Sequence, residues 1–152
     1  MKHESLDALR QTADVVPVVE GKLLTRRERL ERWADLLEHH DGAVRPLSRV
    51  EFVPADERKT LRGDDTPLAI AFSDPVLRAA GMPSDRYGDG KGFFELSENE
   101  AHHILCNCHY AGGMSGPRVA ARIRAAANRG TAAELFYKAR DALFGRFFHR
   151  HA

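Results

Sequence analysis

The sequence has few cysteines and no long apolar run, and both shortages limit what the protein can be. Only two of its 152 residues are cysteine, Cys106 and Cys108, which excludes a disulfide-stabilised scaffold. The longest apolar run covers residues 68–72, far short of the roughly 20 residues that a membrane-spanning helix needs. No apolar segment follows the polar start, so we expect a cytoplasmic protein without a secretory signal, whose two cysteines stay reduced.

Net charge is also nearly absent, because the formal charge is only +1 with neutral histidines. This value excludes a uniformly basic nucleic-acid binder. The charge is nevertheless unevenly distributed, since residues 51–100 are acidic overall and residues 101–152 are basic. Two interpretations remain open. The two regions face each other in the fold, or the arginines of the basic region form a surface for an anionic partner.

Three capping boxes predict where the longest helices begin. In each, a Ser or Thr hydroxyl and a Glu three residues later can satisfy the first free amides of a helix. They start at Thr25, Ser97 and Thr131. They predict helices over residues 26–40, over residues 98–110, and from residue 132 toward residue 149.

Proline at the first helical position predicts further helices. Thr66-Pro67 and Asp74-Pro75 predict two short ones, although residues 67–72 are also compatible with a buried strand. Ser115-Gly116-Pro117 predicts another that runs to about residue 128, and residues 84–92 form a loop or a weak helix.

These elements together predict a mainly α fold. We expect a compact bundle of about six or seven helices with at most a short β-hairpin near residues 43–54. We also expect a single helical domain over residues 25–152, preceded by an N-terminal arm over residues 1–24.

The segment from Glu100 to Tyr110 contains the most reactive side chains. On a continuous helix, His102, Cys106 and His109 share one face, and imidazole and thiolate are zinc ligands. The first and last of the three lie about 10 Å apart along such a helix, so a further ligand has to come from elsewhere. The best candidates for this further ligand are His39 and His40, at the end of the first long helix.

Two other interpretations of this segment remain open. Cys106 and Cys108 point roughly 160° apart on a helix, so they can bind the same ion only if the helix breaks between them. Without a metal, both cysteines are packing residues and the histidines lie at the surface. No orienting acid or oxyanion donor is evident beside Cys106, so we predict no catalytic residues and favour a non-enzymatic role.

The last predicted helix has more aromatic side chains than one buried face needs. Its second aromatic stripe is formed by Tyr137, Phe144 and Phe148, and Arg118 and Arg122 supply basic charge nearby. These five residues predict a small regulatory or adaptor protein that binds a protein partner or a second copy of itself. The alternatives are a zinc-binding or redox-sensing protein and a DNA-binding regulator; no other cofactor and no small-molecule substrate is indicated.

Overall fold

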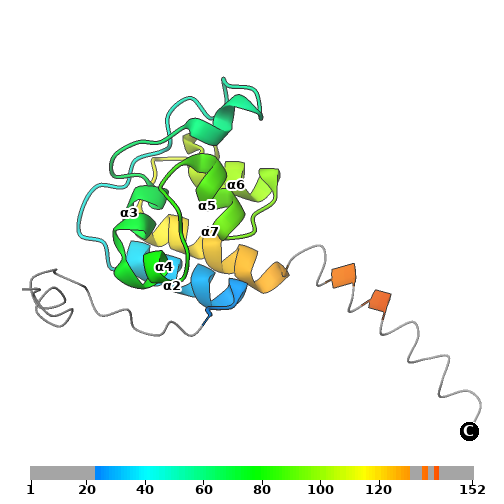
Figure 1. Ribbon diagram of the computed structural model, residues 1–152. Coiled ribbons are helices and arrows are strands. Elements are labelled where there is room, and N and C mark those ends of the chain that lie inside the picture. Colours follow the sequence, from blue (N-terminus) through cyan, green and yellow to red (C-terminus); the bar gives the residue numbers. More distant parts are fainter. Residues whose placement is uncertain (1–22, 131–134, 137–138, 141–152) are drawn as a thin grey trace, which may run out of the picture.

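Helices build the fold, as the sequence predicts (Figure 1). The computed structural model describes residues 23–130, 135–136 and 139–140. This part contains the α-helices α2 (Arg26–Glu38), α3 (Pro67–Ser73), α4 (Pro75–Ala79), α5 (Tyr87–Phe93), α6 (Glu98–Leu105) and α7 (Gly116–Arg129). It also contains the 3-10 turns η1 (Glu57–Thr60) and η2 (Asn107–His109). Nearly all of the predicted N-terminal arm and most of the predicted last helix lie outside the described residues.

The first long helix starts where its capping box predicts. The Thr25 hydroxyl accepts from the Glu28 amide at 3.2 Å, and the Glu28 carboxylate accepts from the Thr25 amide at 2.8 Å. α2 therefore begins at Arg26, and it ends at Glu38. Both bonds join residues three apart, so local sequence alone is enough to fix this boundary.

The core lies where α2 packs along α7 (Figure 1). Trp33 is fully buried in α2, its ring stacks on Phe94 with the ring centroids 4.3 Å apart, and its indole N–H donates to Pro67 O at 2.8 Å. The other buried hydrophobic residues of the two helices are Leu30, Ala34 and Leu37 of α2 and Val119, Ala120, Ile123, Ala126 and Ala127 of α7. One indole thus connects α2 to both α3 and the segment after α5.

The start of α7 lies unusually close to the end of α2. A Cβ atom added to Gly116 would lie 2.0 Å from the carbonyl oxygen of Leu37, closer than any non-bonded contact allows. Only glycine fits at this position, and Pro117 follows it in the first turn. The close approach fixes α7 against α2, which makes α7 a rigid base for side chains on its other faces.

The two short helices α3 and α4 settle the question left open for residues 67–72. The Thr66 hydroxyl accepts from the Ala69 amide at 3.1 Å and Pro67 occupies the first turn, so this segment is a helix and not a strand. Asp74 caps α4 through the Leu77 amide at 3.0 Å. The same carboxylate accepts two hydrogen bonds from Arg32, at 2.6 and 2.7 Å, which connects α4 to α2.

The region near residues 43–54 has a turn over residues 48–52 and is otherwise irregular, and the described residues contain no strand. A backbone hydrogen bond from Phe52 N to Arg49 O (3.1 Å) closes one turn. The Leu47 amide donates to Leu105 O at 3.2 Å, which holds this region against the end of α6. No helix in the described part is long and apolar enough to cross a membrane.

Candidate metal site

The helix that carries the histidines and cysteines ends earlier than the sequence predicts. α6 begins as expected, with the Ser97 hydroxyl and the Glu100 carboxylate each accepting from the other residue's amide, at 3.2 and 3.0 Å. It ends at Leu105, whereas the sequence pattern predicts that it continues to Tyr110. That prediction is wrong, because Cys106 is extended, with ψ 129°, and only the 3-10 turn η2 follows it.

The early end of α6 is stabilised by partners for carbonyl groups that a longer helix would satisfy itself. The His103 carbonyl accepts from Arg122 Nη1 at 2.7 Å, the Ile104 carbonyl from the Tyr110 hydroxyl at 2.7 Å, and the Leu105 carbonyl from the Leu47 amide at 3.2 Å. One donor lies in α7, one follows η2, and one precedes η1. The end of α6 is therefore set by tertiary contacts and not by a glycine or proline at the boundary.

The break brings the two cysteines together. Their Sγ atoms lie 2.7 Å apart, although side chains two residues apart on a continuous helix point in nearly opposite directions. Cys106 is buried and Cys108 is exposed. The condition under which these two thiols can bind the same ion is thus met.

The same break brings two histidines together. His102 Nδ1 lies 2.9 Å from His109 Nε2, and the rings meet edge to face with their centroids 5.0 Å apart. Three ligand atoms lie within 4.8 Å of one another, one each from His102, Cys108 and His109. Of the three predicted ligands, the structure brings the two histidines close together and adds Cys108, which the sequence analysis placed on a different face.

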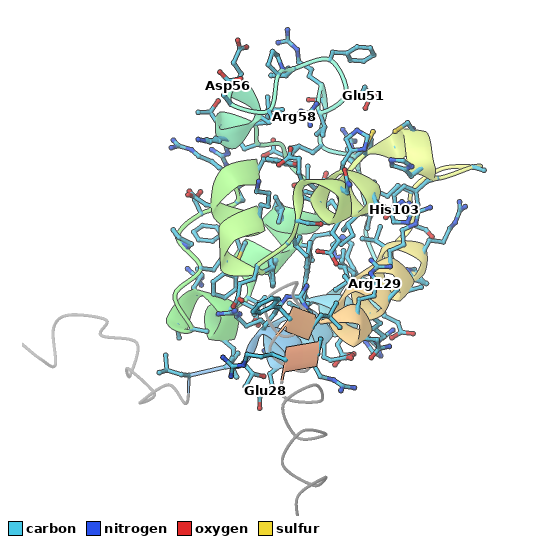
Figure 2. The ribbon with its side chains drawn as sticks, turned by 90° about the vertical axis from the view of Figure 1, so that its right-hand side faces the viewer. Glu28, Glu51, Asp56, Arg58, His103 and Arg129 are labelled. Carbon is cyan, nitrogen blue, oxygen red and sulfur yellow. The ribbon has the colours of Figure 1, made fainter. Side chains whose placement is uncertain are left out.

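A carboxylate from a distant part of the chain reaches the third predicted ligand, Cys106. The Cys106 thiol donates to Glu51 Oε2 at 2.6 Å, and ligand atoms of Glu51, Cys106 and Cys108 also lie within 4.8 Å of one another. Figure 2 shows Glu51 in the loop that lies near the end of α6. No local sequence pattern marks Glu51, because 55 residues separate it from Cys106.

The loop that carries Glu51 is tied to the first turn of α6. Arg58, labelled in Figure 2, donates to Val53 O at 2.6 Å and to the Glu98 carboxylate at 3.1 Å. The same Glu98 carboxylate accepts from the Tyr87 hydroxyl at 2.9 Å. Glu98 also binds Lys91, at 2.7 Å, so the loop is held by a network of charged groups and not by one pair.

Burial shapes the protonation of the site. Burial, together with the hydrogen bonds to Cys108 and Glu51, raises the pKa of Cys106 to about 12. Burial also lowers the pKa of His102, and the neighbouring His109 adds to this shift. Without an ion, Cys106 is therefore a neutral thiol and His102 a neutral imidazole near pH 7. Neutral imidazole is the form that binds metals.

The histidines border a hollow of about 930 Å³. His102, His103 and His109 line one part of it, and Arg129 at the end of α7 lines another. Figure 2 shows His103 and Arg129 on the same side of the molecule as Glu51. Cys108 and His109 are exposed. An ion bound at the histidine pair would therefore be accessible to solvent.

The other predicted ligands and contact residues have different positions. His39 and His40 border a separate hollow beside α2 and belong to neither group of close ligand atoms. Neither lies in a group with His102, Cys106 or His109, so the structure does not support the expectation that one of them supplies a further ligand. Tyr137, Phe144 and Phe148 lie outside the described residues, so the aromatic contact surface stays a prediction.

The two arginines predicted to contact a partner have partners within the chain. Arg118 donates to Gly113 O at 2.6 Å. The Arg122 guanidinium lies 3.8 Å from the centre of the Tyr110 ring and donates to two backbone carbonyls beside the histidines. A role for them in partner binding stays a prediction.

No protein-family model, curated protein or solved structure matches this chain. The chemistry of the site therefore carries the functional argument. Its donors form the pattern His-x3-Cys-x-Cys-His over residues 102–109, with the Glu51 carboxylate beside them.

Proposed function

We propose that this protein binds one zinc ion through His102, Cys106, Cys108 and His109. The observation that carries the proposal is the end of α6 at Leu105, because it brings Cys108 beside Cys106 and beside the His102–His109 pair, whereas a continuous helix would point Cys108 away from them. Two imidazoles and two thiolates are a donor set typical of tetrahedral zinc.

The distances in the metal-free site are compatible with this assignment. Zinc bonds of roughly 2.0–2.3 Å imply that neighbouring ligand atoms lie about 3–4 Å apart. The ligand atoms of His102, Cys108 and His109 already lie within 4.8 Å of one another. Cys106 belongs to the second group, with Glu51 and Cys108, so to bind the same ion it would exchange its hydrogen bond with Glu51 for a bond to the metal and move toward the histidines.

Zinc at this position would act mainly on structure. The ligands come from the last turn of α6, from Cys106 at the break and from η2, so a bound ion would join the two sides of the helix break. Binding free energy at such a site adds to the folding free energy. We accordingly expect a zinc-dependent conformation of residues 102–110, which is suited to a regulatory role.

A metal titration tests the proposal. We expect the purified chain, stripped of metal with a chelator and reduced, to bind one Zn²⁺ per molecule. Co²⁺ added in place of Zn²⁺ should bind at the same site with the same stoichiometry. The Co²⁺ form should show intense visible bands of a tetrahedral site together with thiolate charge-transfer absorption. The matched control is the same protein with both thiols alkylated, which should show neither. Octahedral Co²⁺ bands, or no stoichiometric binding, would contradict the proposal.

A second candidate function, thiol redox sensing, is favoured by the contact between the two cysteines. Their Sγ atoms are 2.7 Å apart, so a two-electron oxidant such as hydrogen peroxide can convert the pair into a disulfide. The S–S bond forms as the O–O bond breaks, the two sulfurs are oxidised, and both thiol protons leave in two water molecules. Oxidation of the zinc form would release the ion, because a disulfide is not a thiolate ligand.

Mass spectrometry distinguishes this candidate from accidental oxidation. We expect peroxide to remove two hydrogen atoms from the metal-free chain and to create a bond between Cys106 and Cys108 that a reductant reverses. The Cys108→Ala variant is the control, since it has no partner for Cys106. Products that contain only added oxygen, or only disulfides between two chains, would rule out the sensing role.

The protein-contact and DNA-binding functions indicated by the sequence remain predictions. The aromatic residues on which the first depends lie outside the described residues. For DNA binding, the exposed polar side chains of this segment that could contact bases are His103, which borders the hollow beside the metal site, and Asn107. Neither arrangement favours these functions over metal binding.

A further inference from the structure

We propose that Arg122 is a positioning residue for the metal site, acting by holding the main chain on both sides of the helix break. The inference rests on the proposed zinc site and adds a residue that is not itself a ligand. It explains how ligands on α6 and on η2 are kept facing each other without glycine or proline at the break.

Arg122 extends from a rigid part of the molecule. It lies in the middle of α7, whose residues Val119 and Ile123 are fully buried in the core. The start of α7 is fixed by the contact between Gly116 and the Leu37 carbonyl. A side chain that projects from this helix therefore has a well-defined origin from which to bind the more irregular segment after α6.

The guanidinium of Arg122 makes three contacts around the break. Nη1 donates to the His103 carbonyl at 2.7 Å, and Nη2 donates to the His109 carbonyl. The group also lies 3.8 Å from the centre of the Tyr110 ring, within range of a cation–π interaction. One planar group thus fixes the distance between a residue adjacent to His102 and the ligand residue His109 itself.

The chemistry of arginine suits this task better than that of lysine. A guanidinium offers several N–H groups in a fixed planar fork, so it can bind two carbonyls and stack on an aromatic ring at the same time. A lysine ammonium can reach one carbonyl but cannot reproduce the fork. Arg118, one turn earlier on α7, provides a natural comparison: it binds Gly113 O and its guanidinium lies 5.8 Å from the centre of the Tyr110 ring, but it donates to no carbonyl of the ligand segment over residues 102–109.

Zinc affinity of matched variants tests the inference. We expect Arg122→Ala to raise the zinc dissociation constant by roughly 10–100-fold, the usual effect of losing a group that orients ligands. Arg122→Lys should give an intermediate value. Arg118→Ala should stay within about twofold of the unchanged chain, as expected for an exposed side chain away from the ligands. Equal affinities for Arg122→Ala and Arg118→Ala would overturn the inference.

Thiol labelling of the metal-free protein separates this inference from the proposed function. With Ellman's reagent we expect the exposed Cys108 to react quickly and the buried Cys106 slowly. In Arg122→Ala both thiols should react quickly, because the segment after α6 is no longer held, whereas Arg118→Ala should keep the slow phase. If the unchanged chain binds no zinc, the proposed function fails. If Cys106 keeps its slow labelling in Arg122→Ala, the positioning role fails.

Discussion

Replacing His102 with alanine should weaken zinc binding by roughly a hundredfold or more, whereas the same change at His103, whose ring centroid lies 4.9 Å from that of His109 without offering a ligand atom, should cost far less. The two residues are neighbours on α6, yet only His102 has a ring nitrogen in the group of close ligand atoms. Loss of an outer-shell group already costs roughly 10–100-fold in affinity, so loss of a ligand should cost at least as much.

The pair of variants is well matched. Both remove an imidazole from the last turns of the same helix, so their effects on helix stability should be similar. The His103 carbonyl, which Arg122 binds, belongs to the main chain and survives the substitution. Competition against a chromophoric chelator gives the dissociation constants. If both variants lose the same affinity, or neither does, the ligand assignment is wrong.

Replacing Trp33 with alanine should lower the free energy of unfolding by about 3–5 kcal/mol. The indole is fully buried, stacks on Phe94 and donates to the Pro67 carbonyl. The truncation therefore leaves a cavity between α2 and the segment after α5 and also removes the indole's hydrogen bond to that carbonyl. Such a loss is a large share of the roughly 5–15 kcal/mol that stabilises a typical domain.

Urea unfolding followed by circular dichroism measures this effect, since the variant lacks the only tryptophan and its fluorescence. Phe52→Ala provides the control, because it also removes a large aromatic ring but from a side chain that is 82% exposed. Its effect should stay within about 0.5 kcal/mol. Similar losses for the two variants would show that the core is not centred on Trp33.

Local sequence was a good guide to where helices begin. The capping boxes at Thr25 and Ser97 both form, and the Thr66-Pro67 and Asp74-Pro75 pairs open α3 and α4. Each of these signals uses a side chain and an amide within three residues of each other. Such bonds depend little on the rest of the fold, which is why a sequence pattern can predict them.

The helix α5, in contrast, could not be predicted from local sequence. Its sequence contains three glycines, which favour a loop, and the sequence left the choice between loop and weak helix open. In the structure this segment is a helix that packs closely against α3. The packing is so close that a Cβ atom on Gly90 would lie 2.5 Å from Leu68 Cδ2. Close packing with α3 therefore requires a small residue there, which no local pattern reveals.

The sequence by itself determined the helical class, the helix starts and the kinds of side chain in the His–Cys segment. Only the tertiary structure decided that α6 ends at Leu105 and that Glu51 lies beside Cys106. The reason is the origin of the hydrogen-bond donors. The carbonyls at the end of α6 are satisfied by Leu47, Tyr110 and Arg122, from three separate parts of the chain, and these groups come together only when the whole fold forms.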